Sequence, residues 1–505
     1  MFLPSPPNTT EKYLYADSGR YKLYTLSIVT TSLLIIGMFL FVAINPLFFP
    51  YTIFVLITSA YLIISNAIGL LGKDFDYEKH VELATRHFDK SAHQEVDLFL
   101  PICGEKIEVL RNTWESAYHF RAAHEGKINI YVLDDGHDFE ARGLAGSMRF
   151  NYITRETNEL KKAGNLRNAF AKTKAEFFII LDADFTIRKD FLLETLPYMF
   201  ENENVGILQT PQYFETKGDL NLIEKGSAQI QELFYRLIQT SRDTFKGAIC
   251  VGTSALYRRS FLEKHGGTAA IEWSEDVHSA VLIMKDLHDV KYIPLILTKG
   301  MCADNLKTFF TQFYRWSTGS MSLMLDKSFW LSPLTIAQKI CFSTGFGFYV
   351  TTGLAAAMSF IPSIYLLIFK PQYVLWFNIL WAIPSLLLTN IYMRFWQKTG
   401  YSWAAVQCRA ISSYAHLFAL HDILLKKTEG WIPTGSGGKS GRYQNFVNFV
   451  FYHTCGLGII LFSLIGFRFA TIDKTNFIPL TLLCAYHIAA LWPAIKEFKF
   501  EPDNR

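Results

Sequence analysis

Apolar residues in this chain form long stretches without charge near both ends, with a segment of mixed polarity between them. No Asp, Glu, Lys or Arg occurs between Lys22 and Lys73, a gap long enough for two helices of about 20 residues each. Asn45, Pro46 and Pro50 lie in its middle and predict a turn between the two helices. The gap is too long for a signal peptide, so we expect two membrane-spanning helices.

Four more charge-free stretches lie in the second half of the chain. Each is long enough to cross a bilayer once. They comprise residues 340–369, 371–393, 443–467 and 475–495. The first is long, and Pro362 predicts a kink in it. The pattern therefore predicts six membrane-spanning helices.

Basic residues are distributed unequally between the two sides of these spans. The N-terminal tail and the segment between the fourth and fifth spans carry most of the Lys and Arg, whereas the opposite loops are short and nearly uncharged. The positive-inside rule then places both termini and the long middle segment in the cytosol. We expect a multi-pass protein of the plasma membrane with any chemistry on its cytosolic side.

The middle segment alternates apolar runs of strand length with helical patterns. A helical pattern covers residues 158–173. The predicted strands are 96–100, 128–133, 177–181 and 205–208. This alternation is typical of an α/β domain with a mixed, mostly parallel sheet. Residues 219–245 have helical apolar spacing and predict either a helix at the membrane interface or a helix packed on its own domain.

The predicted organisation has five parts. They are a cytosolic tail with two transmembrane helices (1–72), a cytosolic α/β domain with interface helices (73–339), two transmembrane helices (340–393), a cytosolic interface helix and loop (394–442), and two transmembrane helices with a short tail (443–505).

Composition narrows the class of protein further. The chain of 505 residues is 50% hydrophobic and 19% charged, below the soluble norm of about 25% charged residues. Its formal net charge of +4 is too small to indicate nucleic-acid binding by bulk charge. The 7 Cys are scattered, without CxxC spacing, so we expect neither a disulfide framework nor a zinc site.

Acidic residues follow two of the predicted strands directly. Asp134 and Asp135 come after the second strand, and Asp182 and Asp184 come after the third. Ligands of open α/β sheets bind at the carboxyl ends of the strands. Two carboxylates spaced as in Asp182-x-Asp184 can hold Mg²⁺ or Mn²⁺, which in turn can bind a diphosphate. The alternative for each pair is a solvated turn.

Two later motifs combine charge with helical spacing. Glu275 and Asp276 follow Ser274, and without other evidence they indicate a helix N-terminus with acids in its first turn. Gln312, Arg315 and Trp316 would share one face of a helix, where Arg can bind phosphate and Trp can stack on a sugar. The alternative for the second motif is an amphipathic helix with Trp at the membrane surface.

In this order and between membrane spans, the motifs resemble the processive family-2 glycosyltransferases, most of all the catalytic subunit of bacterial cellulose synthase. The matching residues are Asp134-Asp135-Gly136, Lys162-Ala163-Gly164-Asn165, Asp182-x-Asp184, Thr210-Pro211-Gln212, Ser274-Glu275-Asp276 and Gln312-x-x-Arg315-Trp316. The resemblance implies a GT-A fold, a UDP-sugar donor, and Mg²⁺ or Mn²⁺ as cofactor.

The resemblance also implies residue roles. The uridine and diphosphate of the donor would contact Asp134, Asp135, Lys162, Asp182, Gln312 and Arg315, and the metal would bind Asp184 with Asp182. Asp276 would be the catalytic base beside Glu275, and the acceptor sugar would contact Trp316, Gly252 and Thr253. A gating loop over the nucleotide would include Trp431, Pro433, Thr434, Lys439 and Arg442, with a plain cytosolic linker as the alternative.

The chain departs from the family pattern at several places. Ser274 replaces the usual Thr, residues 101–105 lack the usual Thr-Tyr-Asn run, and the gating loop lacks the Val-Thr-x-Lys form. Only residues 496–505 follow the last span and no RxxxR motif occurs elsewhere, so we expect no cyclic-di-GMP-binding domain.

The expected function is a processive, inverting synthase. It would polymerise a β-linked polysaccharide, with UDP-glucose favoured as donor, and pass the growing polymer through its own pore across the bilayer. Three alternatives stay open: a synthase of a hyaluronan-, chitin- or capsule-like polymer, a non-processive transferase acting on a lipid-linked acceptor, and a transporter without catalysis. The acidic clusters count against the transporter, and the glycosidic linkage is not predicted.

Overall fold

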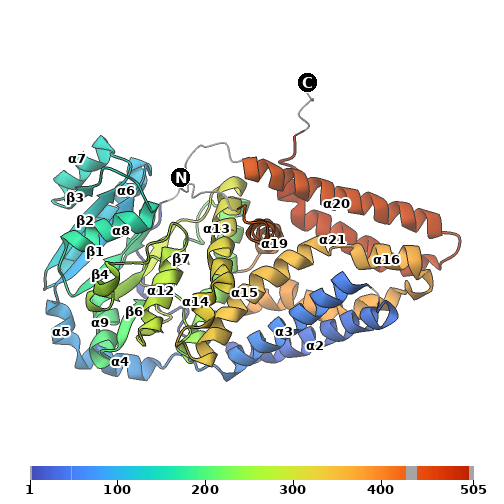
Figure 1. Cartoon of the computed structure of the whole chain (residues 1–505), viewed down its shortest axis with the longest axis horizontal. Helices are drawn as coiled ribbons and strands as arrows, with labels where there is room; N and C mark the ends of the chain where they lie inside the picture. Colours follow the sequence, from blue (N-terminus) through green and yellow to red (C-terminus); the bar gives the residue numbers. More distant parts are fainter. Residues whose placement is uncertain (1–2, 47, 428–440, 500–505) are drawn as a thin grey trace.

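The molecule has an α/β part and a bundle of long helices, joined by helices that lie between them. The computed structural model describes residues 3–46, 48–427 and 441–499. Helices α2 (Arg20–Ile44) and α3 (Phe49–Leu71) lie in the bundle beside helices from the C-terminal half (Figure 1). The α/β part is therefore inserted between membrane-type segments, as the sequence predicts.

A seven-stranded sheet forms the centre of the α/β part. Its order is β3-β2-β1-β4-β8-β6-β9. The strands are β1 (Val96–Ile102), β2 (Ile128–Asp134), β3 (Asn151–Thr154), β4 (Phe177–Ile180), β6 (Val205–Gln209), β8 (Ala255–Arg258) and β9 (Asp289–Tyr292). Only β8 runs antiparallel to its neighbours. The predicted mixed, mostly parallel sheet is confirmed.

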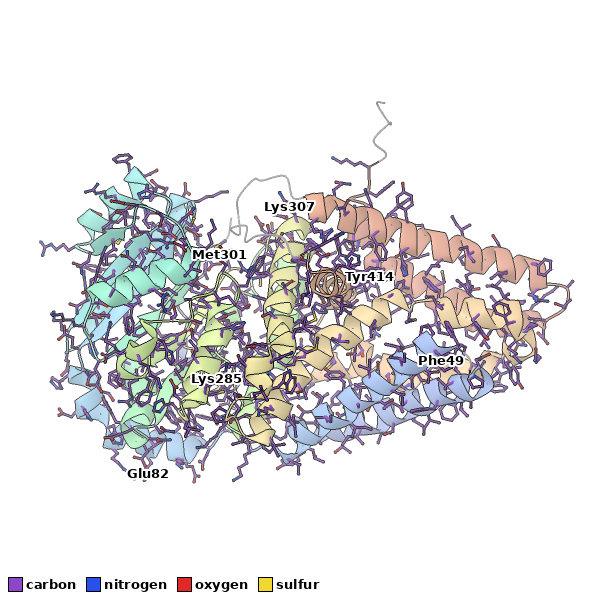
Figure 2. All side chains as sticks on the ribbon, viewed as in Figure 1. Phe49, Glu82, Lys285, Met301, Lys307 and Tyr414 are labelled. Atoms are coloured by element: carbon purple, nitrogen blue, oxygen red, sulfur yellow. The ribbon has the colours of Figure 1, made fainter. Side chains whose placement is uncertain are left out.

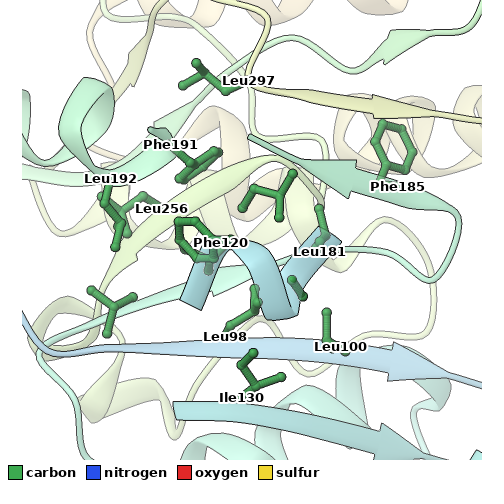
Figure 3. Packing of buried hydrophobic residues seen from close by; sticks show 14 of the residues in the cluster. Leu98, Leu100, Phe120, Ile130, Leu181, Phe185, Phe191, Leu192, Leu256 and Leu297 are labelled. Atoms are coloured by element: carbon green, nitrogen blue, oxygen red, sulfur yellow. The ribbon is translucent and has the colours of Figure 1, made fainter. Parts of the chain in front are cut away.

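Helices cover both faces of this sheet because its central strands are apolar on both sides. Alternate residues of a strand point to opposite faces, so Leu98 and Leu100 pack with α6 (Ile107–Ala123) and α9 (Phe191–Glu201). Phe99 packs on the other face with α8 (Lys161–Lys172) and α12 (Glu275–Lys285). Figure 3 shows Leu98 and Leu100 in the first of these layers.

A second, three-stranded sheet and short helices complete the α/β part. The small sheet has the order β5-β10-β7, with β5 (Phe185–Ile187), β10 (Thr298–Gly300) and β7 (Tyr213–Phe214). The short helices are α1 (Thr9–Lys12), α4 (Tyr77–Arg86), α5 (Phe88–His93) and α7 (Phe139–Ser147), with 3₁₀ turns η2 (Arg259–Phe261) and η3 (Glu263–His265).

Five helices in the described part of the chain are long and apolar enough to cross a membrane. They are α2, α3, α15 (Ile336–Ala357), α20 (Gly441–Arg468), and η7 (Lys474–Phe477) continuing into α21 (Ile478–Ile495). This is the composition of a multi-pass membrane protein. The chain between α15 and α16 (Ile361–Phe369) breaks before Pro362, which lies in the first turn of α16, so the kink predicted at Pro362 is a helix break.

The sixth predicted span, residues 371–393, is not one continuous helix. It is divided into η4 (Pro371–Tyr373), η5 (Trp376–Trp381), α17 (Ile383–Leu387), the π-helix η6 (Leu388–Tyr392) and the start of α18 (Met393–Trp396). Hydropathy reports the apolar length of a segment and not the continuity of its hydrogen bonds, which explains the difference.

Several helices lie between the α/β part and the bundle. The predicted helix at 219–245 is built from α10 (Leu222–Glu232), the π-helix η1 (Leu233–Gln239) and α11 (Thr240–Asp243). It packs on α19 (Trp403–Leu424), where Gly226 lies against Ala404 and Cys408. Helices α13 (Leu306–Leu325) and α14 (Lys327–Trp330) lie beside them. Figure 2 labels Lys307 on α13 and Tyr414 on α19 at this junction.

Candidate active site

The carboxyl ends of three parallel strands bring acidic side chains to one edge of the large sheet. The register pairs Ile102 of β1 with Asp134 of β2. Glu105 follows β1, and Asp182 follows β4 on the other side of β1. The loop before the antiparallel β8, with Gly252 and Thr253, reaches the same edge because that strand runs in the opposite direction.

Lys162 joins three of these segments. It lies in the first turn of α8, and its Nζ is 2.5 Å from Asp182 Oδ1 and 3.7 Å from Glu275 Oε1. It also donates to the carbonyl of Gly252 at 3.3 Å. Burial lowers the pKa of Lys162, but the charges of Asp182 and Glu275 outweigh that effect and raise it. The lysine therefore stays cationic in the centre of the acidic cluster.

The two residues of the Asp134-Asp135 pair lie in different surroundings. Asp134 is fully buried, and its oxygens accept hydrogen bonds from the backbone N–H groups of residues 136–138 and from the hydroxyl of Tyr152. The side chain of Asp135 is 6% exposed and accepts from Arg155 Nε at 2.7 Å and Nη2 at 2.6 Å. Asp134 thus fixes the shape of the loop, and Arg155 holds Asp135 in place beside it.

Glu275 and Asp276 occupy the first turn of α12, with Ser274 as the residue that precedes it. Burial raises the pKa of Asp276 to about 7, and the charge of Glu275 adds to the effect. Gly252 has φ +81°, and a Cβ there would lie 2.8 Å from Asp276 Oδ2. Only glycine fits this position without strain, because both the backbone angle and the carboxylate exclude a side chain.

Thr253 links the loop before β8 to the end of β4. Its side chain is fully buried, and its Oγ1 accepts the backbone N–H of Asp182 at 2.9 Å. The neighbouring Asp184 has its pKa raised to about 7, first by burial and then by the charge of Asp182. A cation at this position would remove that electrostatic cost.

The donor set at Asp182 and Asp184 fits a divalent cation. Among the residues that the structure describes, no group of three or more His, Cys, Asp and Glu side chains forms a complete metal site. Mg²⁺ is commonly held by one or two carboxylates, with water and substrate phosphates completing its shell. Two neighbouring carboxylates with a raised Asp184 pKa therefore suit a metal that binds together with a diphosphate.

The motif Gln312, Arg315 and Trp316 lies on α13, so its predicted helical conformation is confirmed. Trp316 is half-buried, and its ring meets that of Phe313 edge to face at 5.0 Å. Helix α13 touches the start of α12 at Gly319, where a Cβ would lie 1.7 Å from Ser274 Oγ. This contact places the motif helix directly beside the turn that carries Asp276.

Most of the residues predicted for a gating loop lie outside the part of the chain that the structure describes. Trp431, Pro433, Thr434 and Lys439 lie outside the described residues. Arg442 lies in the first turn of α20 and forms an ion pair with Asp422 near the end of α19. Helix α19 lies within the segment 394–442, and the ion pair with Arg442 ties it to α20.

Two residues near these carboxylates were not predicted from the sequence. Glu105 accepts the backbone N–H of Cys103 at 2.6 Å, and burial raises its pKa, with Asp182 and Asp134 adding to the effect. Its position just after the first predicted strand was the available signal. Arg155 had no comparable signal, because its bidentate contact with Asp135 spans 20 residues of sequence.

Comparison with known proteins identifies this domain. The family model "Glycosyl transferase family 2" matches residues 97–266. The chain is 28% identical over 258 residues to the cellulose synthase catalytic subunit [UDP-forming] of Xanthomonas axonopodis pv. citri, covering 50% of this chain and 35% of that protein. It is 30% identical over 251 residues to cellulose synthase 1 catalytic subunit [UDP-forming] of Komagataeibacter xylinus, covering 49% and 34%.

The chain spans about a third of the length of these two relatives. Among solved structures, a mannosyltransferase from Pyrobaculum calidifontis in complex with GDP-Man and Mn²⁺ matches with a TM-score of 0.45 and 13% identity, covering 74% of this chain and 100% of that one.

The family match covers β1 to β8, the strands that surround the acidic edge. Residues 97–266 thus match the family-2 glycosyltransferases, and about half of the chain is similar in sequence to cellulose synthase catalytic subunits.

Proposed function

We propose that this protein is a processive, inverting glycosyltransferase that polymerises a β-linked polysaccharide, with UDP-glucose as the favoured donor, and passes the polymer across the plasma membrane. One juxtaposition carries the proposal. Asp276 lies against Gly252 within the Lys162, Asp182 and Glu275 cluster, and the α12 turn that bears it touches the helix carrying Arg315 and Trp316. In this proposal Asp276 would be the base, Lys162 and Arg315 the phosphate-binding cations, and Trp316 the aromatic platform.

The donor diphosphate would lie between α8 and α13. Lys162 and Arg315 supply positive charge for the phosphates, and Arg315 has no carboxylate partner among the residues described. Asp135 and Asp182 would hold the nucleoside side of the donor. A divalent cation held by Asp182 and Asp184, when bound, would neutralise charge on the leaving diphosphate.

Asp276 would accept the proton of the attacking hydroxyl. A positioned carboxylate base typically contributes about 10²–10⁴-fold to such a step, and its raised pKa suits a base that works near neutral pH. The acceptor oxygen forms a bond to the anomeric carbon as the bond to the diphosphate breaks. A single displacement inverts the configuration, so an α-linked donor gives a β-linked product.

Trp316 would carry the terminal sugar of the acceptor. The flat indole face packs on sugar C–H groups, and its N–H can donate one hydrogen bond. The membrane helices support synthesis coupled to export, because a hydrophilic polymer made on one side of a bilayer needs a protein path through it. The orientation with the catalytic domain in the cytosol rests on the distribution of Lys and Arg.

The test is to supply the purified full chain, in lipid nanodiscs, with single UDP-sugars and either Mg²⁺ or Mn²⁺. We expect UDP release and a long β-linked product with UDP-glucose. A polymer formed only from another UDP-sugar would correct the substrate. Single additions to a lipid acceptor would favour the non-processive alternative, and no UDP release with any sugar would refute the proposal.

A further inference from the structure

The face of α13 opposite its motif makes a buried polar contact that the proposed chemistry does not use. Tyr314 immediately precedes Arg315, and successive helical residues point about 100° apart. Its side chain is buried, and its hydroxyl donates a hydrogen bond of 2.6 Å to Asp422 Oδ2. The contact joins residues 108 positions apart in the sequence.

Asp422 gathers groups from three helices on one carboxylate. It is fully buried near the end of α19, and besides Tyr314 it accepts hydrogen bonds from Arg442 Nε at 2.7 Å and Arg442 Nη2, and lies 2.9 Å from His421 Nδ1. Burial raises the pKa of Asp422, but the hydrogen bonds from Arg442 and Tyr314 outweigh it and hold the pKa below its usual value. A buried carboxylate kept in the charged form makes strong, directional hydrogen bonds.

Aromatic rings also pack between these helices. Phe310 of α13 packs on Phe446 of α20 with ring centres 4.3 Å apart, and on Phe418 of α19 at 6.2 Å. Ring contacts of this kind hold helices together but tolerate small rotations, because dispersion attraction has little directionality. The hydrogen bond from Tyr314 to Asp422 is directional, and Tyr314 lies next to Arg315 in the sequence.

We propose that Asp422 is a positioning residue, which through the Tyr314 hydroxyl fixes the rotation of α13 and so sets where Arg315 and Trp316 lie in the active site. Arg442 keeps the carboxylate charged and ties the same point to the start of α20. The inference rests on the proposed function, since it assigns the donor and acceptor contacts to Arg315 and Trp316.

The test compares Tyr314→Phe with Tyr198→Phe in the full chain. Each change removes one hydroxyl that makes a hydrogen bond. The Tyr198 bond, to His80 Nδ1 at 2.9 Å, is partly buried and lies in the α/β part away from α13. We expect Tyr314→Phe to lower kcat/KM for the UDP-sugar by about tenfold, since misplacement of about 1 Å can cost about a hundredfold. Tyr198→Phe should leave kcat and KM within twofold at a comparable Tm.

Asp422→Asn removes the negative charge of the carboxylate and keeps the size of the side chain. We expect it to lower kcat/KM at least as much as Tyr314→Phe, and the double variant to be no worse than Asp422→Asn alone, because both changes break one coupled contact. Fully additive losses in the double variant would contradict the coupling. So would kcat and KM of Tyr314→Phe within twofold of the wild type.

A second readout keeps the inference distinct from the proposed function. Amide hydrogen exchange over residues 306–325 reports the order of α13 without any substrate. We expect faster exchange there in Tyr314→Phe and not in Tyr198→Phe, and unchanged exchange would overturn the positioning role. If the wild-type protein neither binds UDP nor transfers sugar, the proposed function fails, and the exchange result still decides whether Asp422 orders α13.

Discussion

Neighbouring carboxylates at this site differ in what balances their charge. Asp182 pairs with Lys162, whereas burial and the charge of Asp182 raise the pKa of Asp184 to about 7. At the start of α12, burial and the charge of Glu275 do the same to Asp276. A site that holds neighbouring acids in unlike states is suited to divide roles between them.

Asp276→Asn should abolish sugar transfer and leave UDP affinity within about twofold. An amide keeps the size of the carboxylate and its place against Gly252 but cannot accept the proton of the acceptor hydroxyl. Turnover by coupled UDP release and UDP binding by calorimetry would check this. Turnover near the wild-type rate would remove Asp276 from the base role.

The pH profile provides the accompanying check on Asp276. The base works only when ionised, and its folded pKa of about 7 is above the ordinary value for Asp, so activity should fall as the pH drops through 7. Glu275→Gln removes a neighbouring negative charge and should shift this acidic limb to lower pH. An unshifted limb in Glu275→Gln would show that another group titrates.

Asp184→Ala should weaken both UDP affinity and the response to Mn²⁺. If the metal joins Asp182 and Asp184 to the diphosphate, loss of one carboxylate affects ground-state binding as well as the chemical step. A Mn²⁺ titration of UDP binding measures this, with Glu140→Ala on the exposed part of α7 as a control for lost charge. Equal titrations of Asp184→Ala and wild type would refute the metal assignment.

Substitutions of Trp316 distinguish a role in binding the acceptor sugar from a role as a membrane anchor. We expect Trp316→Ala to fold and bind UDP but to make little long polymer, with rates lowered by about a hundredfold. Trp316→Phe should be clearly impaired in elongation, because phenyl lacks the indole N–H. Product length resolved by gel or chromatography is the measurement. Wild-type chain length from Trp316→Phe together with normal yield from Trp316→Ala would favour the anchor.

At the scale of elements, α12 and α13 meet beside the proposed site. Both helices approach closely because Gly319 has no side chain, and a Cβ there would lie 1.7 Å from Ser274 Oγ and 2.6 Å from Ser274 Cβ. An added methyl group would therefore push α13 away from the turn that holds Asp276. By contrast, a Cβ built on Gly143 of α7 meets nothing within 4 Å.

Gly319→Ala should lower transfer by about tenfold or more, by the same misplacement argument. Gly143→Ala in α7 is the matched control, and we expect it to keep activity and gain up to about 1 kcal/mol in stability, because alanine is the better helix former. Steady-state kinetics and thermal unfolding of both variants give the comparison. Unchanged kinetics in Gly319→Ala would mean that the two helices need no close contact.

At the scale of the whole molecule, arginine contacts link the helices that lie between the α/β part and the bundle. Arg236 of η1 pairs with Glu232 at 2.8 Å and donates to the carbonyl of Trp396, while its guanidinium lies 4.3 Å from the Trp396 ring centre. Arg20 of α2 pairs with Asp74 at 2.7 Å. These contacts hold η1 to the end of α18 and the start of α2 to the segment after α3.

Sealed vesicles test the proposed direction of export. In inside-out vesicles the proposed orientation places the catalytic domain outside, so externally added UDP-sugar should give a product protected from added glycanase until detergent is present. Right-side-out vesicles should make no product without permeabilisation. If glycanase degrades the product in intact inside-out vesicles, translocation is contradicted. The proposal that the protein synthesises the polymer would still stand.

The sequence by itself determined the organisation of the chain and the inventory of its chemistry. Hydrophobic length located the five continuous spans, and periodicity located β1, β2, β4 and β6 to within a few residues. The ordered motifs pointed to the family that the match to residues 97–266 confirms. These signals are local, because strand alternation, helical spacing and motif order are all properties of short stretches.

The tertiary structure alone decided which of the predicted site residues are buried and which hydrogen bonds hold them. It buried Asp134 beneath its own loop, brought Glu105 and Arg155 to the site, and divided residues 371–393 into short turns. It also joined Tyr314 to Asp422 across 108 positions. Burial and hydrogen-bond partnership depend on residues far apart in the chain, so no pattern within a short stretch can specify them.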